Sequence, residues 1–492
     1  MNSPKASTGL AGLDEILVGG LNKGQNALLR GPPGAGKTIF GLHFLAAGIE
    51  AGEKSLYLNL GEPADYVRAT ADFFGLYPEE IHFRSLSPTH EEFSEDETYS
   101  LFEASEVENP GYITDLKAAI EDIDPDRVLL DPITEFRFLT SDDRQFRKQI
   151  LAFLDYLKVN DATVVLTSQV AKTFPDEDLQ FLTDTVLTLE IESDHRNVQV
   201  SKFRGSSFLS GKHAYDIRSS GVAVWPTIQP HLESKQNQSL SSLSSGVPEL
   251  DDLLGGGLTE GTVTFISGPT GAGKTTTGIH FLKEAISQGK RAALYEFEES
   301  KRTLLDRATA VNVPIDSMVE AGDLRLAEVL PGEMTVGEFG QTVKHAVEED
   351  NVEVIMIDGT TGFKQNLRGM DSRSQQDLIR IGRYLTSKGV TLIIPNEIHS
   401  ITGSFNVTEE GSSNLADTII FIRHVEYKGE MRKVIGTLKK RTGDFERSLR
   451  ELEITESGLR VGDPLPHLRG ILTGTPDWNG NDRTDTTPER PK

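Results

Sequence analysis

Short apolar runs and longer amphipathic runs alternate along the whole chain. Apolar runs typical of buried strands cover residues 26–30 and 263–267, and runs with helical spacing follow at 39–49 and 276–286. Further strand-like runs lie at 54–60, 127–131, 162–168, 186–190, 198–205, 291–297, 354–358, 390–395, 418–423 and 434–441. Strands that alternate with helices predict an α/β fold, in which mostly parallel sheets are flanked by helices.

The pattern occurs twice, which indicates an internal duplication. GLAGLDEILVGGL at residues 9–21 and GVPELDDLLGGGL at 246–258 lie 237 residues apart. A stretch rich in Ser and Gln separates the two copies, and a segment rich in Pro, Gly, Asp and Thr ends the chain. We therefore expect two domains at residues 1–230 and 245–465. A linker at 231–244 connects them, and a flexible tail follows at 466–492.

Each copy carries a glycine-rich loop between a predicted strand and a predicted helix. The sequences GPPGAGKT at 31–38 and GPTGAGKT at 268–275 match G-x-x-x-x-G-K-[ST], whose backbone N–H groups wrap nucleotide phosphates. The lysine reaches the β- and γ-phosphate oxygens, and the last hydroxyl holds Mg²⁺. We therefore expect ATP and Mg²⁺ as cofactors. The candidate binding residues are Gly31, Gly34, Ala35, Gly36, Lys37 and Thr38 in the first copy, and Gly268, Gly271, Ala272, Gly273, Lys274 and Thr275 in the second.

Carboxylates follow a predicted strand soon after each loop helix. Glu62 has this place in the first copy, and Glu298 and Glu299 have it in the second. A carboxylate beside a phosphate loop can orient and deprotonate the water that attacks the γ-phosphate. These glutamates, with Lys37 and Lys274, are the candidate catalytic residues; an exposed acidic turn is the alternative interpretation.

A second strand end in each copy carries an aspartate, Asp131 or Asp358. We expect these aspartates to support the metal held by Thr38 and Thr275, although a strand-terminal Asp by itself is usually a turn residue. The next strands end in Gln169 and Asn396. These two residues are either sensors of the γ-phosphate or simple strand-end turns.

Composition narrows the functional classes. The 492 residues include 75 Asp and Glu against 50 Lys and Arg, which gives a formal charge of −25. This balance favours a salt-adapted, archaeal source and disfavours nucleic acid as a partner, since non-specific DNA binding depends on Lys and Arg. The chain has no cysteine, which excludes disulfides and thiolate chemistry. No apolar run approaches the roughly 18 residues of a membrane span, so we expect a cytoplasmic protein.

Taken together, these motifs resemble the KaiC family within the RecA-like ATPases. The resemblance covers residues 7–462, and its most specific part is the segment 417–431 that leads into a K-x-R strand. It implies two tandem RecA-like P-loop domains and a ring, usually a homo-hexamer, with ATP between subunits. It also implies that the K-x-R cations reach the γ-phosphate of a neighbour's nucleotide, where they stabilise charge in phosphoryl transfer. These cations are Lys202, Arg204, Lys439 and Arg441.

This chain departs from the family pattern at two places. The family's paired glutamates match Glu298 and Glu299, but the first copy offers Gly61 and Glu62, so we expect slower hydrolysis at the first site. The adjacent phosphoacceptors of clock-type members match Ser413 and Asn414, with Ser412 just before them. One hydroxyl is missing, so a two-site phosphorylation cycle is not expected. Ser412 and Ser413 stay candidate phosphoacceptors, with ordinary loop serines as the alternative.

Three functions are compatible with the sequence. The first is a ring-forming, KaiC-like ATPase with slow Mg²⁺-dependent hydrolysis and serine autophosphorylation in the second domain, serving signalling or timing with regulatory proteins that the sequence does not identify. The second is a DNA-dependent motor or recombinase on the same core. The third is a regulatory scaffold that binds ATP without hydrolysing it. Fold analogy does not separate them, because function resides in sites.

Overall fold

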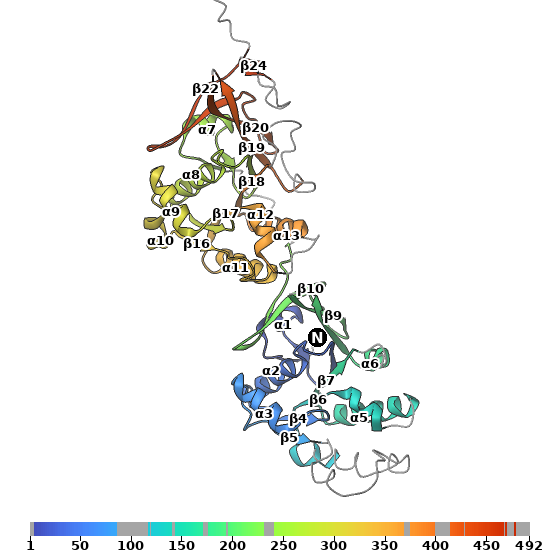
Figure 1. The fold of residues 1–492 in the computed structure, drawn as a ribbon. Helices are drawn as coiled ribbons and strands as arrows, with labels where there is room; N and C mark the ends of the chain where they lie inside the picture. The colour runs from blue at the N-terminus through green and yellow to red at the C-terminus, as the bar shows by residue number, and fades with distance from the viewer. Residues whose placement is uncertain are drawn as a thin grey trace, which may run out of the picture. The chain divides into compact units, whose positions relative to one another are not determined.

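The fold was analysed in a computed structural model. It describes residues 4–85, 117–118, 120–139, 143–170, 176–192, 195–230, 241–368, 374–398, 414–427, 429–466, 468–469 and 477–478. The acidic segment 86–116, most of the expected linker, most of the expected tail and both candidate phosphoacceptors, Ser412 and Ser413, lie outside these residues. Contacts divide the chain into two compact units, Met1–Thr227 and Ile228–Lys492 (Figure 1).

Unit 1 is built around one nine-stranded sheet. The described strands of this unit are β1 (Lys5–Ala6), β2 (Leu21–Asn22), β3 (Asn26–Gly31), β4 (Ser55–Asn59), β5 (His82–Ser85), β6 (Arg127–Asp131), β7 (Thr163–Gln169), β8 (Thr185–Glu192), β9 (His195–Phe203), β10 (Lys212–Arg218) and β11 (Gly221–Trp225). The nine-stranded sheet contains β3 to β11, and β1 pairs with β2 in a separate two-stranded sheet. Its described helices are α1 (Ala11–Ile16), α2 (Lys37–Glu50), α3 (Ala64–Phe73), the 3-10 helix η1 (Ile133–Leu139), α5 (Asp143–Val159) and α6 (Glu177–Leu182).

Unit 2 repeats this plan with a second nine-stranded sheet. The described strands of this unit are β12 (Ser242–Leu243), β13 (Leu258–Thr259), β14 (Val263–Gly268), β15 (Arg291–Glu296), β16 (Leu324–Glu328), β17 (Val352–Asp358), β18 (Thr391–Glu397), β19 (Thr418–Tyr427), β20 (Glu430–Lys440), β21 (Arg450–Thr455), β22 (Gly458–Pro464), β23 (Leu468–Arg469) and β24 (Asp477–Trp478). The nine-stranded sheet contains β14 to β22, while β12 pairs with β13 and β23 with β24 in two separate sheets. Its described helices are α7 (Pro248–Leu253), α8 (Lys274–Ser287), α9 (Lys301–Ala310), α10 (Ile315–Glu320), α11 (Val336–Glu348), α12 (Thr360–Asn366) and α13 (Ser374–Ser387).

The two large sheets have the same strand order. It runs β5-β4-β6-β7-β3-β8-β9-β10-β11 in unit 1 and β16-β15-β17-β18-β14-β19-β20-β21-β22 in unit 2. The first six strands of each order are parallel, and the last three continue the sheet as an antiparallel edge. The strand that leads into the phosphate loop is central in both. The predicted fold class, two mostly parallel sheets flanked by helices, is confirmed.

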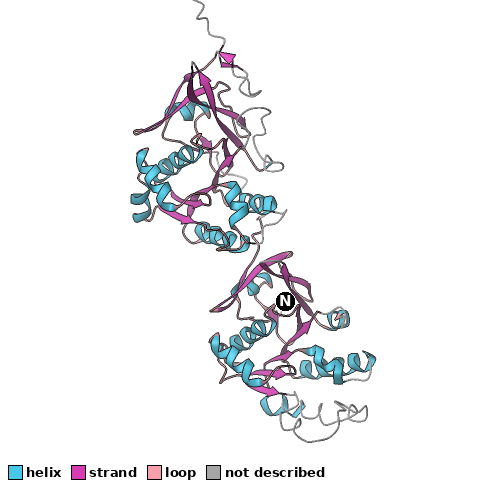
Figure 2. Cartoon of the chain, viewed as in Figure 1, coloured by secondary structure: helices cyan, strands magenta, loops and turns pink. Residues whose placement is uncertain are grey.

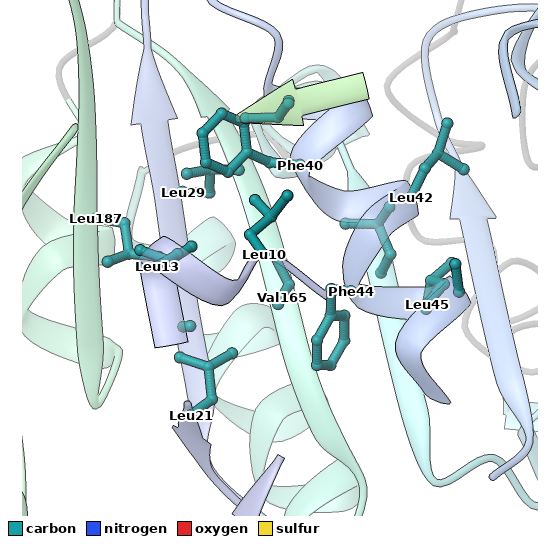
Figure 3. Packing of buried hydrophobic residues seen from close by; sticks show 14 of the residues in the cluster. Leu10, Leu13, Leu21, Leu29, Phe40, Leu42, Phe44, Leu45, Val165 and Leu187 are labelled. Carbon is teal, nitrogen blue, oxygen red and sulfur yellow. The ribbon is translucent and has the colours of Figure 1, made fainter. Parts of the chain in front are cut away.

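Alternate residues of the central strand point to opposite faces of the sheet, as a pleated strand requires. In unit 1, Ala27 and Leu29 join the core beneath α1, α2 and α3, where Phe40 and Phe44 of α2 also pack (Figure 3). Leu28 joins the other core, beneath α5. Helices therefore cover both faces of each sheet (Figure 2). Among the described helices, none combines the length and apolar character that a bilayer crossing requires.

Two candidate nucleotide sites

Each phosphate loop connects a central strand to the start of a 14-residue helix. Gly36 and Gly273, just before the helices, have φ of 83° and 105°, a left-handed conformation that favours glycine. A side chain at either position would also meet an isoleucine, because an added Cβ would lie 2.6 Å from Ile217 and 2.5 Å from Ile454. The loop thus places backbone N–H groups at a helix N-terminus, which suits an anionic phosphate.

The loop lysines fold back on their own loops. Nζ of Lys37 donates to the carbonyl oxygens of Gly31 and Pro32, both at 3.0 Å, and Nζ of Lys274 donates to Pro269 at 3.0 Å. Burial lowers the pKa of both lysines. Asp131 opposes this shift at Lys37, whereas three carboxylates oppose it at Lys274, namely Glu397, Asp358 and Glu298. The second site is therefore the more acidic one.

The expected metal-supporting pairs come together in both units. The Thr38 hydroxyl donates to Oδ2 of Asp131 at 2.7 Å, and the Thr275 side chain is hydrogen-bonded to Asp358. Both aspartates are buried. A hydroxyl and a carboxylate are hard oxygen ligands of the kind Mg²⁺ prefers, so the residues present fit a Mg²⁺ ion bound with nucleotide phosphates.

Tyr57 and Thr167 also donate hydrogen bonds to Asp131, the former at 2.8 Å. Buried hydroxyl donors stabilise the charged form of a carboxylate and hold it in one orientation. The corresponding positions of unit 2 carry Leu294 and Pro395, whose side chains donate no hydrogen bond. Asp131 is therefore fixed by neutral donors, whereas Asp358 lies among other charges.

The end of the strand next to the metal pair also differs between units. In unit 1, Oδ1 of Asn59 accepts hydrogen bonds from the backbone N–H groups of Gly61 and Glu62, at 3.3 and 3.2 Å. In unit 2, Oε1 of Glu296 accepts from Glu298 and Glu299, at 2.9 and 3.0 Å. The same turn is thus held by an amide in one unit and by a carboxylate in the other.

The absence of one glutamate from unit 1 is matched by a change across the turn. Gly61 faces Pro132, and a Cβ on Gly61 would lie 3.0 Å from Cδ of the proline. At the same place in unit 2, Glu298 lies over Gly359, where an added Cβ would come within 2.5 Å of Cγ of Glu298. In each unit, the larger residue of the pair therefore faces a glycine: Pro132 faces Gly61 in unit 1, and Glu298 faces Gly359 in unit 2. Glu62 is exposed beside this turn.

The two glutamates of unit 2 have different partners. Glu299 is ion-paired with Nη2 of Arg307, whose counterpart in unit 1 is the neutral Thr70. Glu298 makes no such pair among the described residues; its partial burial and then the negative charge of Glu397 raise its pKa. Glu298 accepts a hydrogen bond from the backbone N–H of Gly362. A carboxylate with a raised pKa and no guanidinium partner suits proton abstraction better than one bound to a guanidinium.

A hollow of about 400 Å³ opens beside these glutamates. Its lining includes Glu298, Glu299, Glu328, Gly362 and Glu397. The hollow lies at the carboxyl ends of the parallel strands, where α/β sheets bind ligands.

Gln169 and Asn396 do not occupy equivalent positions in the two units. Gln169 lies beside Gly31 in the sheet, whereas Asn396 lies beside Ser267, one residue before the loop. The counterpart of Gln169 is therefore Glu397. Asn396 is buried and accepts a hydrogen bond from Thr360 at 2.8 Å, so it serves the interior of unit 2.

The K-x-R cations lie at the opposite end of the sheet from their own phosphate loops. The backbone N–H of Arg204 bonds to Asp184, and that of Asp184 bonds to Asn26, the first residue of β3. The loop begins at Gly31, five residues or about 16 Å further along the strand. Lys202 donates to carbonyl groups at the end of α6. Neither cation therefore serves the phosphate loop of its own domain.

Unit 2 has the same arrangement. Arg441 bonds through its N–H to Asp417, which bonds to Val263 at the start of β14. The Arg441 guanidinium also pairs with the Asp417 carboxylate at 3.4 Å, and Lys439 donates to the Ala416 carbonyl at 2.6 Å. These cations thus lie at the end of the sheet opposite their own phosphate loop.

Sequence reasoning missed four residues that lie at the sites. In unit 2, Glu296 lies beside Glu299 and Asp358, and Arg307 forms an ion pair with Glu299. Glu397 adds negative charge near Lys274. In unit 1, the Tyr215 hydroxyl donates to the carbonyl oxygen of Ala35 inside the phosphate loop, at 2.8 Å. Comparing the copies position by position would have found Glu296 and Arg307, because each replaces a neutral residue of the first copy.

Comparison with known proteins agrees with this geometry. The family model described as "ATPase: KaiC" matches residues 6–229 and again residues 243–465. "Circadian clock oscillator protein KaiC" from Prochlorococcus marinus (strain MIT 9313) is 28% identical, covering 97% of this chain and 96% of that protein. "Circadian clock protein KaiC3" from Synechocystis sp. is 25% identical, covering 98% and 96%. The chain therefore belongs to the KaiC family of ATPases.

Proposed function

We propose that the chain is a ring-forming ATPase that binds Mg-ATP at both phosphate loops and hydrolyses it slowly, with the second site as the main catalytic centre. One observation supports ranking the second site above the first. Unit 1 has Gly61 facing Pro132, where unit 2 has Glu298 facing Gly359. Only the second site presents a glutamate that is free of an ion pair within the described residues and near its loop lysine.

Each residue of the second site has a distinct task in this proposal. Lys274 holds phosphate oxygens, and Thr275 with Asp358 supports the metal. Glu298 orients the attacking water and takes its proton, which the raised pKa of this carboxylate favours. Bound Mg²⁺ supplies charge neutralisation at the phosphates. In the first site Lys37, Thr38 and Asp131 act in the same way, and Glu62 has to prepare the water alone.

Steady-state ATP hydrolysis by the Lys37→Ala/Lys274→Ala double variant tests this function. We expect turnover to fall to background, because the phosphates lose their principal cation at both loops. A scaffold that only binds ATP would show no difference between wild type and variant. Stimulation of wild-type hydrolysis by single-stranded DNA would instead support a DNA-dependent motor.

We further propose a homo-oligomeric ring, a hexamer by family resemblance, in which the K-x-R cations act on a neighbour's nucleotide. The support is their place at the sheet edge opposite their own loop, since a neighbouring copy then remains the natural recipient. The mass of the particle with and without Mg-ATP tests it. A protein that stays monomeric with nucleotide bound would refute the action in trans.

A role in signalling or timing, with serine autophosphorylation, completes the proposal. It is supported by relatives that carry circadian clock names and by the hydroxyls of Ser412 and Ser413. In this step the serine oxygen attacks the γ-phosphorus, the bond to ADP breaks, and the hydroxyl proton passes to a carboxylate. Mass spectrometry after incubation with Mg-ATP should detect phosphate on the 412–414 peptide and none in a Ser412→Ala/Ser413→Ala control. An unmodified wild-type peptide at full ATP occupancy would exclude the kinase activity.

A further inference from the structure

Glu296 carries a charge that its structural role does not need. This side chain is 1% exposed, and its Oε1 atom closes the strand-end turn by accepting two backbone hydrogen bonds. The neutral Asn59 closes the same turn in unit 1 with the same two bonds. An amide is therefore sufficient for the turn, and the negative charge at this position calls for another explanation.

The second oxygen of Glu296 points to that explanation. Its Oε2 atom is enclosed and receives no hydrogen bond from any residue that the structure describes. Glu299 and Asp358 each bring a carboxylate oxygen to the same place, and the three oxygens lie within 4.8 Å of one another. An enclosed, unpartnered carboxylate oxygen that faces two more carboxylates is an arrangement that lacks a positive ligand.

The charge balance of the cluster leads to the same conclusion. Burying carboxylates together is strongly unfavourable unless protons or cations compensate their charge. Arg307 supplies one positive charge, and it is bound to Glu299, the most exposed of the three. Asp358 accepts a hydrogen bond from Thr275 and lies within the field of Arg307 and Lys274, whereas Glu296, which is nearly fully enclosed, forms no ion pair within the described part of unit 2. Glu296, at the deep end of the cluster, therefore remains without a cationic partner among the described residues.

We propose that Glu296, Glu299 and Asp358 form a divalent-cation site in the second domain, of the Mg²⁺ or Mn²⁺ class, which shares Asp358 with the site of the cation that Thr275 and the nucleotide phosphates hold but takes a second cation. Three carboxylate oxygens suit a hard cation of this size, which keeps waters at its remaining positions. Unit 1 cannot form the site, because Asn59 replaces one carboxylate. The inference deepens the proposed function by giving the second site its own dependence on divalent cations, and its consequence for turnover rests on that function.

Binding of Mn²⁺ to the full chain without nucleotide tests the site directly. We would count free Mn²⁺ by electron paramagnetic resonance for wild type, Glu296→Gln and Glu328→Gln. Gln keeps the volume of Glu and an oxygen that can hold the turn, so the first variant removes the charge alone. Glu328 lines the same hollow outside the cluster and provides the matched control.

We expect wild type and Glu328→Gln to bind one more Mn²⁺ per chain than Glu296→Gln, or to bind it at least about tenfold more tightly. Equal Mn²⁺ binding by wild type and a folded Glu296→Gln variant would overturn the proposal, because the carboxylates would then be compensated by protons only. Retained ATP binding and an unchanged circular dichroism spectrum would show that this variant is folded. Since the titration contains no nucleotide, a chain without ATPase activity would give the same result, and the two proposals can fail separately.

Discussion

The two phosphate loops are nearly identical, but the residues around them differ in charge. In unit 1, three hydroxyl groups donate hydrogen bonds to Asp131, and the neutral Asn59 closes the turn that ends at Glu62. In unit 2, Glu296 and Glu397 add charge around Asp358, and Arg307 compensates part of it. The duplicated loops thus share their sequence pattern and position in the sheet, while the charged groups beyond them differ between the units.

The largest expected difference between the sites lies in the role of Glu298. In a Lys37→Ala background, which isolates the second site, Glu298→Gln should lower turnover about 100-fold, since a positioned base contributes at least this much. Glu299→Gln should lower it less, because Glu299 is already bound to Arg307. Steady-state phosphate release measures both variants. The ranking of the sites is wrong if Glu62→Gln removes most wild-type turnover while Glu298→Gln and Glu299→Gln have little effect.

A second change would rebuild the missing glutamate in unit 1. Gly61→Glu alone should be poorly tolerated, because its Cβ would press on Pro132. The Gly61→Glu/Pro132→Gly double variant reproduces the pair found in unit 2. In a Lys274→Ala background we expect it to raise first-site turnover about tenfold, a modest part of what a positioned base can provide.

Pro132→Gly alone is the control for this gain. It should not raise turnover, since it makes room without adding a carboxylate. A gain from Pro132→Gly equal to that of the double variant would mean that loop mobility, and not the glutamate, limits the first site.

The pH dependence of the second site should reveal the charge of Glu397. This charge and partial burial raise the pKa of Glu298, so the base stays protonated to a higher pH than an ordinary glutamate. Turnover should therefore be lost as the pH falls through that raised pKa. Glu397→Gln removes a negative neighbour, lowers the pKa of Glu298 and should move the acid limb of the kcat profile to lower pH by about one unit or less. An acid limb that moves upward would contradict this assignment.

The smallest expected effect concerns Tyr215, which holds only the first loop. Tyr215→Phe removes the hydrogen bond to Ala35 and should cost about 1 kcal/mol, or about fivefold weaker ATP binding at the first site. The corresponding position in unit 2 is Leu452, so the affinity of the second site should not change. Titration with a fluorescent ATP analogue in each single-site background measures both. Equal weakening at both sites would show a global effect and not a local one.

Much of the fold could be predicted from local patterns. The phosphate loops need a strand before them and a helix after them, and both copies have these in sequence order, so the mostly parallel sheets followed. The antiparallel edges were less accessible. The hairpins β10–β11 and β21–β22 are short and lie outside the apolar runs that predicted strands, although each pairs with the strand just before it in the chain, β9 or β20.

The same limit applies to the sites. The motif predicts Lys274 and Thr275, because their spacing is fixed within one loop. Tyr215, by contrast, reaches a loop 180 residues away, and no local pattern records that contact. Gln169 and Asn396 both follow an apolar run in the sequence. The register of the sheet, which the sequence does not show, decides which residue lies beside the loop. The roles assigned to the site residues remain predictions.

The separation between each K-x-R pair and its own phosphate loop has a genetic consequence. If the cations act on a neighbour, every active site is formed by residues from two copies of the chain. A chain defective at Lys274 and a chain defective at Arg441 would each lack turnover at the second site when alone. Mixed together, they would form some interfaces that pair an intact loop with an intact arginine. Two loss-of-function alleles would then complement each other. One defective allele in excess would inhibit the wild-type protein in a dominant-negative manner.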